Sequence, residues 1–330
     1  MRTGRLTCCR WRTGSMAYGS IRISRCARRA WVDASDVHVS NASLMRARNG
    51  GATDEWCTSW RTVDTELSRH VEALHGRSVH LNCDGPESMF ARWFADHAGM
   101  LHLAALTCTR WNPDAHTLFQ PAASGDRWDW TGAGWEHSRL SGDGSYASRE
   151  CLEISRRSDL VCTNPPFSRF TDYVPRLLDT GADLLVLGPL SLVKSDPVFP
   201  YVLSGRLRFG YTCSQMTFLI DGRTLAVLRN ARWYTTLPVC RPVVSCEGSR
   251  GRPPTVDGMP DVCLVDRLVL LSDEPGLYAV PLTFLDRWPT PGWRLHGLLA
   301  DGAAPWKLGV ARHEGRELFT RLLVERVRDA

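Results

Sequence analysis

Residues 158–170 read SDLVCTNPPFSRF, an apolar run that ends in an asparagine, two prolines and a phenylalanine. Leu160, Val161 and Cys162 have the short apolar character of a buried strand. Two consecutive prolines fix φ and remove two backbone donors, so neither a helix nor a central strand continues through them. We therefore predict a strand that ends in a rigid turn at the carboxyl edge of a sheet, where open α/β folds bind ligands.

The segments around this turn alternate between helical and strand-like patterns. Helical spacing predicts helices over 62–74, 89–97, 149–155 and 170–178, and apolar runs predict strands in SVHLNCDGP (78–86), LHLAALT (101–107) and ADLLVLG (182–188). Alternation of this kind favours an α/β fold with a mostly parallel sheet and helices on both of its faces.

Two further segments are expected to be irregular or antiparallel. MTFLIDGRTLAVL (216–228) reads as two strands around Asp221 and Gly222, a strong hairpin signal. A mostly parallel sheet that ends in an antiparallel hairpin resembles the Rossmann-like fold of S-adenosylmethionine-dependent methyltransferases. The stretch 112–144 is rich in Gly, Asp and Trp, and we expect it to be loop.

Composition is ordinary for a globular chain and excludes some classes. The 330 residues carry a formal net charge of +5, and only Lys194 and Lys307 among the 40 basic residues are lysines. No apolar run approaches the length needed to cross a bilayer, so no membrane partner is expected. The twelve cysteines form no Cys-x-x-Cys pair, which argues against a structural zinc site and favours reduced thiols in the cytoplasm.

The amino-terminal segment is strongly basic. Its first 32 residues contain eight arginines and no acidic residue. This pattern is compatible with a transit peptide, with a basic arm that touches DNA, or with an over-extended start, since Met16 and Met45 are alternative starts. We favour the last interpretation and treat residues 1–50 as a disordered or mis-assigned extension.

The predicted turn offers the groups that an extruded adenine requires. The exocyclic amino group of adenine is a weak nucleophile because its lone pair is delocalised into the ring. The side-chain oxygen of Asn164 and the carbonyl of Pro165 are two acceptors that can expose this lone pair. Pro165 and Pro166 keep the turn rigid, and Phe167 offers a flat face for stacking. The bland alternative is a surface turn without chemistry.

Seven stretches of the chain resemble the EcoRI-type adenine-specific DNA methyltransferases. In order they are DEWCTSW (54–60), LNCDGPESMFARWF (81–94), SGDGSYASRECLEI (141–154), DLVCTNPPFSRFTDYV (159–174), QMTFLI (215–220), VPLTFLDRW (280–288) and GRELFTRLLV (315–324). The resemblance implies S-adenosyl-L-methionine as methyl donor and adenine N6 in double-stranded DNA as acceptor. It also implies that Asn164, Pro165, Pro166 and Phe167 form the catalytic motif.

The resemblance implies further site residues. For the cofactor pocket these are Trp56, Thr58, Asn82, Asp84 and Asp143. Trp56 and Cys57 stand where the family has Phe-Tyr, and Gly144 replaces a Phe that follows the aspartate. Candidates for phosphate or guanine contacts are Arg169, Arg206, Arg208, Arg287 and Arg316.

The family likeness also organises the chain into domains. We expect a methyltransferase catalytic domain over 51–237, a linker over 238–260 and a C-terminal target-recognition region over 261–330. One extruded base per catalytic event requires only a monomer, and a cognate restriction endonuclease is an expected partner. Direct methyl transfer to nitrogen needs no metal and no cysteine nucleophile.

Two alternatives stay open at this point. An RNA or protein-glutamine methyltransferase could use the same motif on another planar amine or amide. A catalytically inactive DNA-binding relative would keep the fold without the activity, and the departures at Trp56, Cys57 and Gly144 are the sequence features that favour it.

Overall fold

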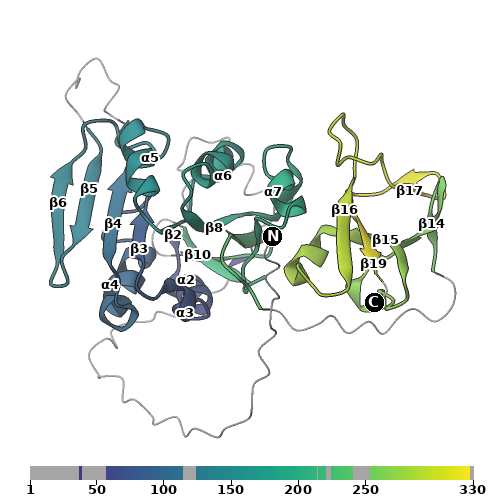
Figure 1. Cartoon of the computed structure of the whole chain (residues 1–330), viewed down its shortest axis with the longest axis horizontal. Helices are drawn as coiled ribbons and strands as arrows, with labels where there is room; N and C mark the ends of the chain where they lie inside the picture. Colours follow the sequence, from purple (N-terminus) through teal and green to yellow (C-terminus); the bar gives the residue numbers. More distant parts are fainter. Residues whose placement is uncertain are drawn as a thin grey trace, which may run out of the picture. The chain divides into compact units, whose positions relative to one another are not determined.

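A large mixed sheet organises the fold (Figure 1). The computed structural model describes residues 37–38, 57–113, 124–213, 215–220, 224–240 and 253–327. The largest sheet within these residues has eight strands, in the order β6 (Trp135–Arg139), β5 (Asp126–Trp130), β4 (Ala105–Arg110), β3 (Ser78–Leu81), β7 (Leu160–Thr163), β8 (Asp183–Pro189), β12 (Ala231–Thr235) and β9 (Arg208–Phe209). The four central strands β4, β3, β7 and β8 are parallel, and the strands flanking them are antiparallel. The predicted α/β class is confirmed.

Helices cover both faces of this sheet, because its central strands are apolar on both sides. In β8, Leu184 and Val186 belong to one apolar cluster, while Leu185 and Leu187 belong to another. Successive side chains of a strand point to opposite faces, so the two clusters lie on opposite sides. Side chains of α6 (Phe170–Leu178) and α7 (Phe199–Leu203) belong to the first cluster. Side chains of α2 (Trp60–Leu67), α3 (Val71–Leu74) and α4 (Met89–Leu101) belong to the second. A further helix is α5 (Arg149–Arg156).

Serine caps begin three of these helices. The hydroxyls of Ser59, Ser88 and Ser148 accept hydrogen bonds from the backbone N–H three residues on, at the starts of α2, α4 and α5. Each cap satisfies one of the orphan donors of a first helical turn. The helices predicted over 89–97, 149–155 and 170–178 are confirmed as α4, α5 and α6, and the strand in ADLLVLG is confirmed as β8.

Two predicted boundaries differ from the structure. The helix expected over 62–74 is split into α2 and α3, because the N–H groups of Arg69 and His70 bond to carbonyls three residues back and tighten the end of α2. The strand expected over 101–107 begins only at Ala105. Leu101 still belongs to α4, and His102 ends that helix in the left-handed region with φ of 49°.

The predicted hairpin forms, but it joins a second sheet. Strands β10 (Met216–Ile220) and β11 (Thr224–Leu228) pair antiparallel, as expected. They associate with β1 (Val37–His38) and β2 (Cys57–Thr58) rather than with the main sheet, which ends beyond β8 in the antiparallel strands β12 and β9. Met216, Phe218 and Leu228 pack in the apolar cluster of α2 and α4, and burial of this face fixes the placement.

The prediction of a loop over 112–144 was wrong for residues 126–139, which form the β5–β6 hairpin. Aromatic rings pair across the strands: Trp130 with Trp135 at 5.3 Å between centroids, and Trp128 with His137 at 5.2 Å. Aromatic pairs that face each other on neighbouring strands help to stabilise a sheet. The turn closes with the N–H of Thr131 on the carbonyl of Gly134 at 3.0 Å. Residues 114–123 lie outside the described residues.

The C-terminal part forms a third sheet. Its strands lie in the order β13 (Thr255–Val256), β14 (Met259–Leu264), β15 (Gly276–Pro281), β19 (Arg321–Arg326) and β16 (Trp293–Leu299), with a separate pair β17 (Arg312–His313) and β18 (Arg316–Glu317). Short 3-10 helices complete the described elements: η2 (Phe167–Arg169), η3 (Leu190–Lys194), η4 (Leu268–Leu270) and η5 (Leu282–Arg287). Strand β13 begins inside the range 238–260 that we expected to be linker, of which residues 241–252 are not described.

The third sheet packs against the main sheet through a shared apolar cluster and a buried ion pair. Tyr278, Leu298 and Val324 belong to the same apolar cluster as α6 and α7. The guanidinium of Arg232 in β12 makes a two-pronged ion pair with Asp286 in η5, at 2.6 and 3.0 Å. Among the helices of the described ranges, none combines the length and apolarity needed to cross a lipid bilayer.

Candidate active site

The carboxyl ends of the central parallel strands lie at one edge of the sheet, and the order in which the chain adds strands reverses at β3. From β3 the chain continues to β4 on one side, whereas β7 lies on the other side of β3. A ligand crevice forms at such a switch point in open α/β sheets. The loop after β3 carries Asn82 and Asp84, and the turn after β7 carries Asn164, so both flank this crevice.

The Asn-Pro-Pro-Phe turn has the rigid shape expected from its prolines. Asn164 is half-buried directly after β7, and Pro165 is buried. Phe167 opens η2 and packs in part against the apolar cluster of α2 and α4. The N–H of Arg169 bonds to the carbonyl of Pro166 at 3.0 Å, and the chain then enters α6. The turn is thus held between a buried strand and a buried helix.

Two side-chain hydrogen bonds tie the strand before this turn and the helix after it to the loop after β3. The hydroxyl of Thr163, the last residue of β7, donates to the carboxylate of Asp84. The phenol of Tyr173, on α6, donates to Oδ1 of Asn82 at 2.6 Å. Burial raises the pKa of Tyr173 well above its usual value, so its hydroxyl stays a donor. The two loops therefore behave as one connected unit.

Two of the candidate cofactor residues carry buried polar atoms without partners in the part of the chain that the structure describes. Nδ2 of Asn82 and Oγ1 of Thr58 are both buried and have no hydrogen-bond partner within the described residues. Because Tyr173 occupies Oδ1 of Asn82, the amide nitrogen must point elsewhere. Buried donors of this kind carry a desolvation cost unless a ligand or water meets them. Trp56, the neighbouring candidate, lies outside the described residues.

Asp143 lies at the same edge, in the loop that faces the end of β4. Its carbonyl accepts from the N–H of Asn112 at 2.8 Å, and its carboxylate accepts from the N–H of Ser145 at 3.0 Å. Gly144 has φ of +80°, and a Cβ there would lie 2.3 Å from the carbonyl oxygen of Arg110. The phenylalanine that the resemblance implied at this position therefore does not fit this backbone.

The structure separates the candidate arginines into groups. Arg169 is exposed one turn after the motif. Arg206 donates to the carbonyl of Leu178 and Arg208 to that of Gly205, at 2.6 and 2.7 Å. Arg208 pairs through β12 with the early part of β8, so both arginines lie toward the amino edge, opposite the motif.

The remaining two arginines belong to the C-terminal part. Arg287 is exposed and follows Asp286, whose ion pair with Arg232 sits beside Gly188 near the carboxyl end of β8. Arg287 is thereby held at the same edge as the Asn164 turn. Arg316 is exposed on β18.

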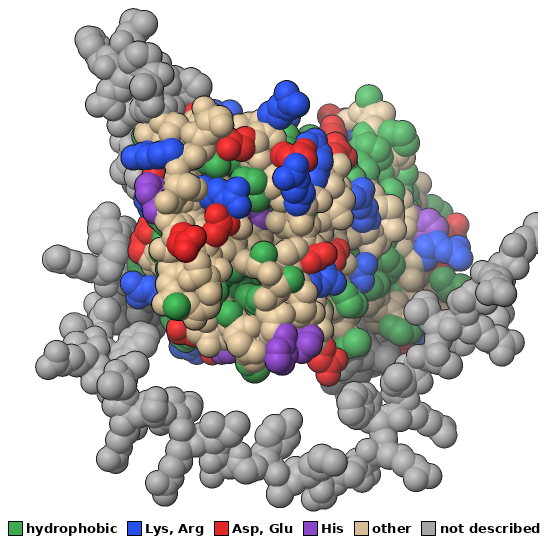
Figure 2. Space-filling view, turned by 60° about the vertical axis from the view of Figure 1, so that its left-hand side comes forward, with side chains coloured by type: hydrophobic (Ala, Val, Ile, Leu, Met, Phe, Trp, Pro, Cys, Tyr) green, Lys and Arg blue, Asp and Glu red, His purple; other side chains and the backbone are tan. Residues whose placement is uncertain are grey.

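The surface near the rim of the site has mixed charge. Figure 2 shows Arg and Lys side chains interleaved with Asp and Glu on the face that carries the β5–β6 hairpin. Arg110, at the end of β4, pairs with Glu87 and also lies 4.8 Å above the ring of Trp128. Arg176 and Arg157 likewise pair with Asp172 and Glu153. Among the described side chains, this view shows no uniformly basic face.

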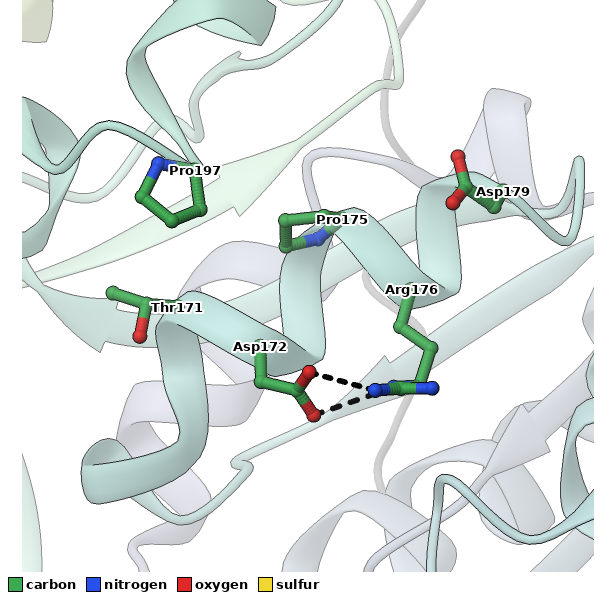
Figure 3. Close-up of a pocket in the computed structure, with 6 residues that line it drawn as sticks. All are labelled: Thr171, Asp172, Pro175, Arg176, Asp179 and Pro197. Carbon is green, nitrogen blue, oxygen red and sulfur yellow. Dashed lines mark hydrogen bonds and ion pairs between the residues drawn. The ribbon is translucent and has the colours of Figure 1, made fainter.

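A shallow hollow of about 520 Å³ lies on the outer side of α6. Figure 3 shows the residues that line it, Thr171, Asp172, Pro175, Arg176, Asp179 and Pro197. Asp172 is already engaged by Arg176 at 2.8 Å and by the hydroxyl of Tyr146 at 2.8 Å, and these bonds lower its pKa. Because this hollow is lined by α6 and Pro197 and not by the loops after β3 and β7, it is not part of the candidate site.

Sequence reasoning missed Tyr173 and the Arg232–Asp286 pair. Tyr173 occupies a core position of an amphipathic helix, and a buried phenol requires a hydrogen-bond partner. That requirement was the available signal, although its partner Asn82 is 91 residues away. Within the described ranges, no group of three or more His, Cys, Asp or Glu side chains could hold a metal ion.

Comparisons with known proteins point to one family. The family model described as adenine-specific methyltransferase EcoRI matches residues 43–303, which confirms the resemblance drawn from the sequence. The chain is 25% identical over 274 residues to Type II methyltransferase M.MgeORF184P of Mycoplasma genitalium, covering 75% of this chain and 84% of that protein.

Two further relatives have similar coverage. Identity is 26% over 273 residues to Type II methyltransferase M.MpnI of Mycoplasma pneumoniae, covering 75% of this chain and 83% of that protein. It is 23% over 289 residues to Type II methyltransferase M.EcoRI of Escherichia coli, covering 76% and 87%. No solved structure matches the chain.

Proposed function

Because the chain belongs to the EcoRI family of adenine-specific methyltransferases, we propose that it methylates N6 of a target adenine in double-stranded DNA. S-adenosylmethionine is the methyl donor in this proposal, and the target base leaves the helix to reach the turn after β7. The observation that carries the proposal is the Asn164–Phe167 turn at the switch point, linked by hydrogen bonds to the loop after β3.

The strand order supports a Rossmann-like methyltransferase topology. The first strand of the parallel set, β3, lies in its middle, with β4 on one side and β7 and β8 on the other. Antiparallel β12 follows β8. This arrangement places the loops after β3, β4 and β7 around one crevice, as a site for a nucleotide-like ligand requires.

Asn164 and Pro165 are proposed to activate the amino group. The side-chain oxygen of Asn164 and the carbonyl of Pro165 accept hydrogen bonds from the two N6 hydrogens and favour a nitrogen whose lone pair is exposed. Pro165 is buried and Pro166 fixes the next backbone angle, so both acceptors are aimed before the base arrives. Phe167 then stacks on the extruded ring.

The loop after β3 is proposed to hold the cofactor. Asn82 offers its unpartnered Nδ2 as a donor, Thr58 offers a buried hydroxyl, and Asp84 and Asp143 offer carboxylates at the same edge. These groups fit a ligand with a polar amino-acid end and a nucleoside end. When bound, S-adenosylmethionine supplies an electrophilic methyl group on a sulfonium. Tyr173 orients the Asn82 amide. Because Tyr173 lies on α6, the helix that follows the catalytic turn, it fixes the position of that amide relative to the turn.

Arg169 and Arg287 are the arginines that we propose for DNA contact, because both are exposed at the edge that carries Asn164. Arg316 is proposed as a contact from the C-terminal part. We further propose that residues 261–330 recognise the DNA sequence, that the enzyme acts as a monomer, and that it belongs with a cognate restriction endonuclease.

A labelled-methyl transfer assay tests the proposal. Purified chain is incubated with tritiated S-adenosylmethionine and, in separate reactions, plasmid DNA, ribosomal RNA and a cell protein extract. The proposal expects label in DNA alone, lost in the Asn164→Ala variant. Label in RNA or protein would replace DNA as the substrate, and cofactor binding without transfer to any acceptor would favour an inactive relative.

A further inference from the structure

Phe319 projects into solvent from the segment between β18 and β19. It is 92% exposed, while Met100, the next most exposed large apolar residue of the described surface, is 53% exposed. A phenylalanine whose ring is surrounded by water contributes almost nothing to the core. Single exposed apolar residues are common on protein surfaces, so its surroundings decide whether it has a role.

The backbone on both sides of Phe319 is fixed. The N–H of Leu318 bonds to the carbonyl of Ala311 at 2.9 Å, and Arg321 begins β19, where it pairs with Pro281 and Leu299. The hydroxyl of Thr320 accepts from the ammonium of Lys194 at 3.2 Å. The ring is therefore presented from an anchored segment, and little ordering cost remains when it inserts into a partner.

This anchoring connects Phe319 to the catalytic edge. Lys194 ends η3, which directly follows the carboxyl end of β8, the neighbour of β7. Lys307 makes a second bridge, with Asp196 at 2.8 Å. These two lysines are the only ones in the chain, and both join the segment after β8 to the C-terminal part. Phe319 is thus tied to the strand next to the one that carries Asn164.

The charges around Phe319 suit nucleic acid. Arg312 and Arg316, on the β17–β18 hairpin just before it, are exposed and form no ion pair with any described residue. Glu314 and Glu317 lie on the same hairpin, Glu317 opposite Arg312 in the register. Cations beside a projecting apolar ring are the features with which proteins hold phosphates and wedge apart base steps.

We propose that Phe319 enters the duplex beside the target adenine and fills the space that this base leaves. The inference rests on the proposed function and extends it. The ring stacks on the neighbouring base pairs, which stabilises the extruded state without any contact to the reacting N6 atom. Phe319 is therefore a positioning residue, and its effect depends on how firmly the target base is paired.

Methylation rates on two duplexes test this role. Both contain the motif found by sequencing of modified DNA, and the target adenine is paired in one and mispaired in the other. We expect Phe319→Ala to methylate the paired duplex about 10- to 100-fold more slowly than wild type, because extrusion of a paired base loses its support. On the mispaired duplex its rate should return to within about 3-fold of wild type, because a mispaired base leaves the stack more easily.

Two further variants serve as controls. Phe319→Trp keeps a stacking ring and should retain the wild-type rate on both duplexes. Val269→Ala removes another exposed apolar side chain of the C-terminal part and should change neither rate. A wild-type rate of Phe319→Ala on paired DNA, or an equal loss on both duplexes, would overturn the inference and leave the proposed function standing. Wild-type protein that methylates neither duplex would overturn the proposed function and this inference with it.

Discussion

The two edges of the main sheet differ in how their polar groups are arranged. At the amino edge, Asp159 accepts from both the N–H and the hydroxyl of Ser78, and Arg77 pairs with Asp183, which also accepts from Thr236. Nε of Arg208 at this edge is also buried without a partner among the described residues, but the same guanidinium donates to the carbonyl of Gly205. At the carboxyl edge, Nδ2 of Asn82 is buried without a partner among the described residues, in the loop that follows β3. Closed networks stabilise a fold, whereas an unmatched buried donor costs stability and suits a site that a ligand completes.

This difference predicts that changes at the carboxyl edge affect chemistry and that changes at the amino edge affect stability. The largest expected effect belongs to Asn164→Ala. Loss of one aimed acceptor should lower the methyl-transfer rate by about 100- to 1000-fold, as removal of a single transition-state hydrogen bond does elsewhere. Because Asn164 is only half-buried in a turn, the melting temperature should stay unchanged. A single-turnover assay measures the rate, and calorimetry measures the melting temperature. A large drop in the melting temperature of Asn164→Ala would contradict the prediction that changes at the carboxyl edge affect chemistry and not stability.

Acid should weaken the fold through His80, which lies inside the sheet between the two edges. Its ring nitrogens bond to the hydroxyls of Ser155 and Thr109 at 3.0 and 2.9 Å, and burial, helped by Arg127, lowers its pKa from 6.5 to about 3. Below pH 6.5 the unfolded chain binds a proton at His80, whereas the folded chain does not. The contribution of neutral His80 to the free energy of unfolding is therefore fully present above pH 6.5 and is lost as the pH falls toward 3. The loss at pH 5 should be about 2 kcal/mol.

Urea unfolding at pH 7 and pH 5 measures this effect. In His80→Gln the same comparison should show a smaller loss, because the variant has no imidazole to protonate. An equal loss in both proteins would assign the acid sensitivity to other groups.

Tyr173→Phe should weaken cofactor binding by about fivefold, since one buried hydrogen bond that orients a ligand-binding amide is worth about 1 kcal/mol. Isothermal titration calorimetry with S-adenosylmethionine measures the affinity directly. The methyl-transfer rate at saturating cofactor should stay close to wild type, which a general loss of structure would not allow. Unchanged affinity would remove Asn82 from the proposed cofactor pocket.

Asp159→Asn tests the amino edge. Its hydrogen bonds from Ser78 lower the pKa of Asp159, so the stabilisation is present above the ordinary carboxyl pKa and is lost as the pH falls through the lowered value. The residue is mostly exposed, so the substitution should reduce the melting temperature by only a few degrees at pH 7. Methyl transfer should be unaffected, and a matching drop in activity would contradict the division between the edges.

The smallest expected effect is that of Arg287→Ala on DNA binding. An exposed arginine that contacts one phosphate should weaken binding several-fold and reduce the slope of log K against log salt by about one. Fluorescence anisotropy at several salt concentrations measures this slope. Arg206→Ala is the matched control from the amino edge, and an equal effect of both substitutions would mean that neither contacts DNA specifically.

Local signals predicted the central part of the site and missed its long-range contacts. The turn at Asn164 is predictable because two prolines interrupt an apolar run, and no other segment needs to be known. The β5–β6 hairpin was missed because its alternation uses tryptophan and charged residues rather than Val or Ile. The second sheet of β10 and β11 could not be predicted, since its partners β1 and β2 lie more than 150 residues earlier in the chain.

The same limit applies to the site residues. Asn82 and Tyr173 are 91 residues apart, and Arg232 and Asp286 are 54 apart, so neither pair leaves a local trace. Arg206 and Arg208 resembled DNA contacts in the sequence, and only the register of β9 with β12 places them toward the far edge of the sheet.

The most direct test of the central claim is long-read sequencing of genomic DNA from a methylation-deficient bacterium that expresses the full chain. The Asn164→Ala variant is expressed in parallel. We predict one adenine-containing sequence motif that carries N6-methyl groups with wild type and lacks them with the variant. Unmodified adenines throughout the genome, despite folded and cofactor-binding protein, would contradict the account.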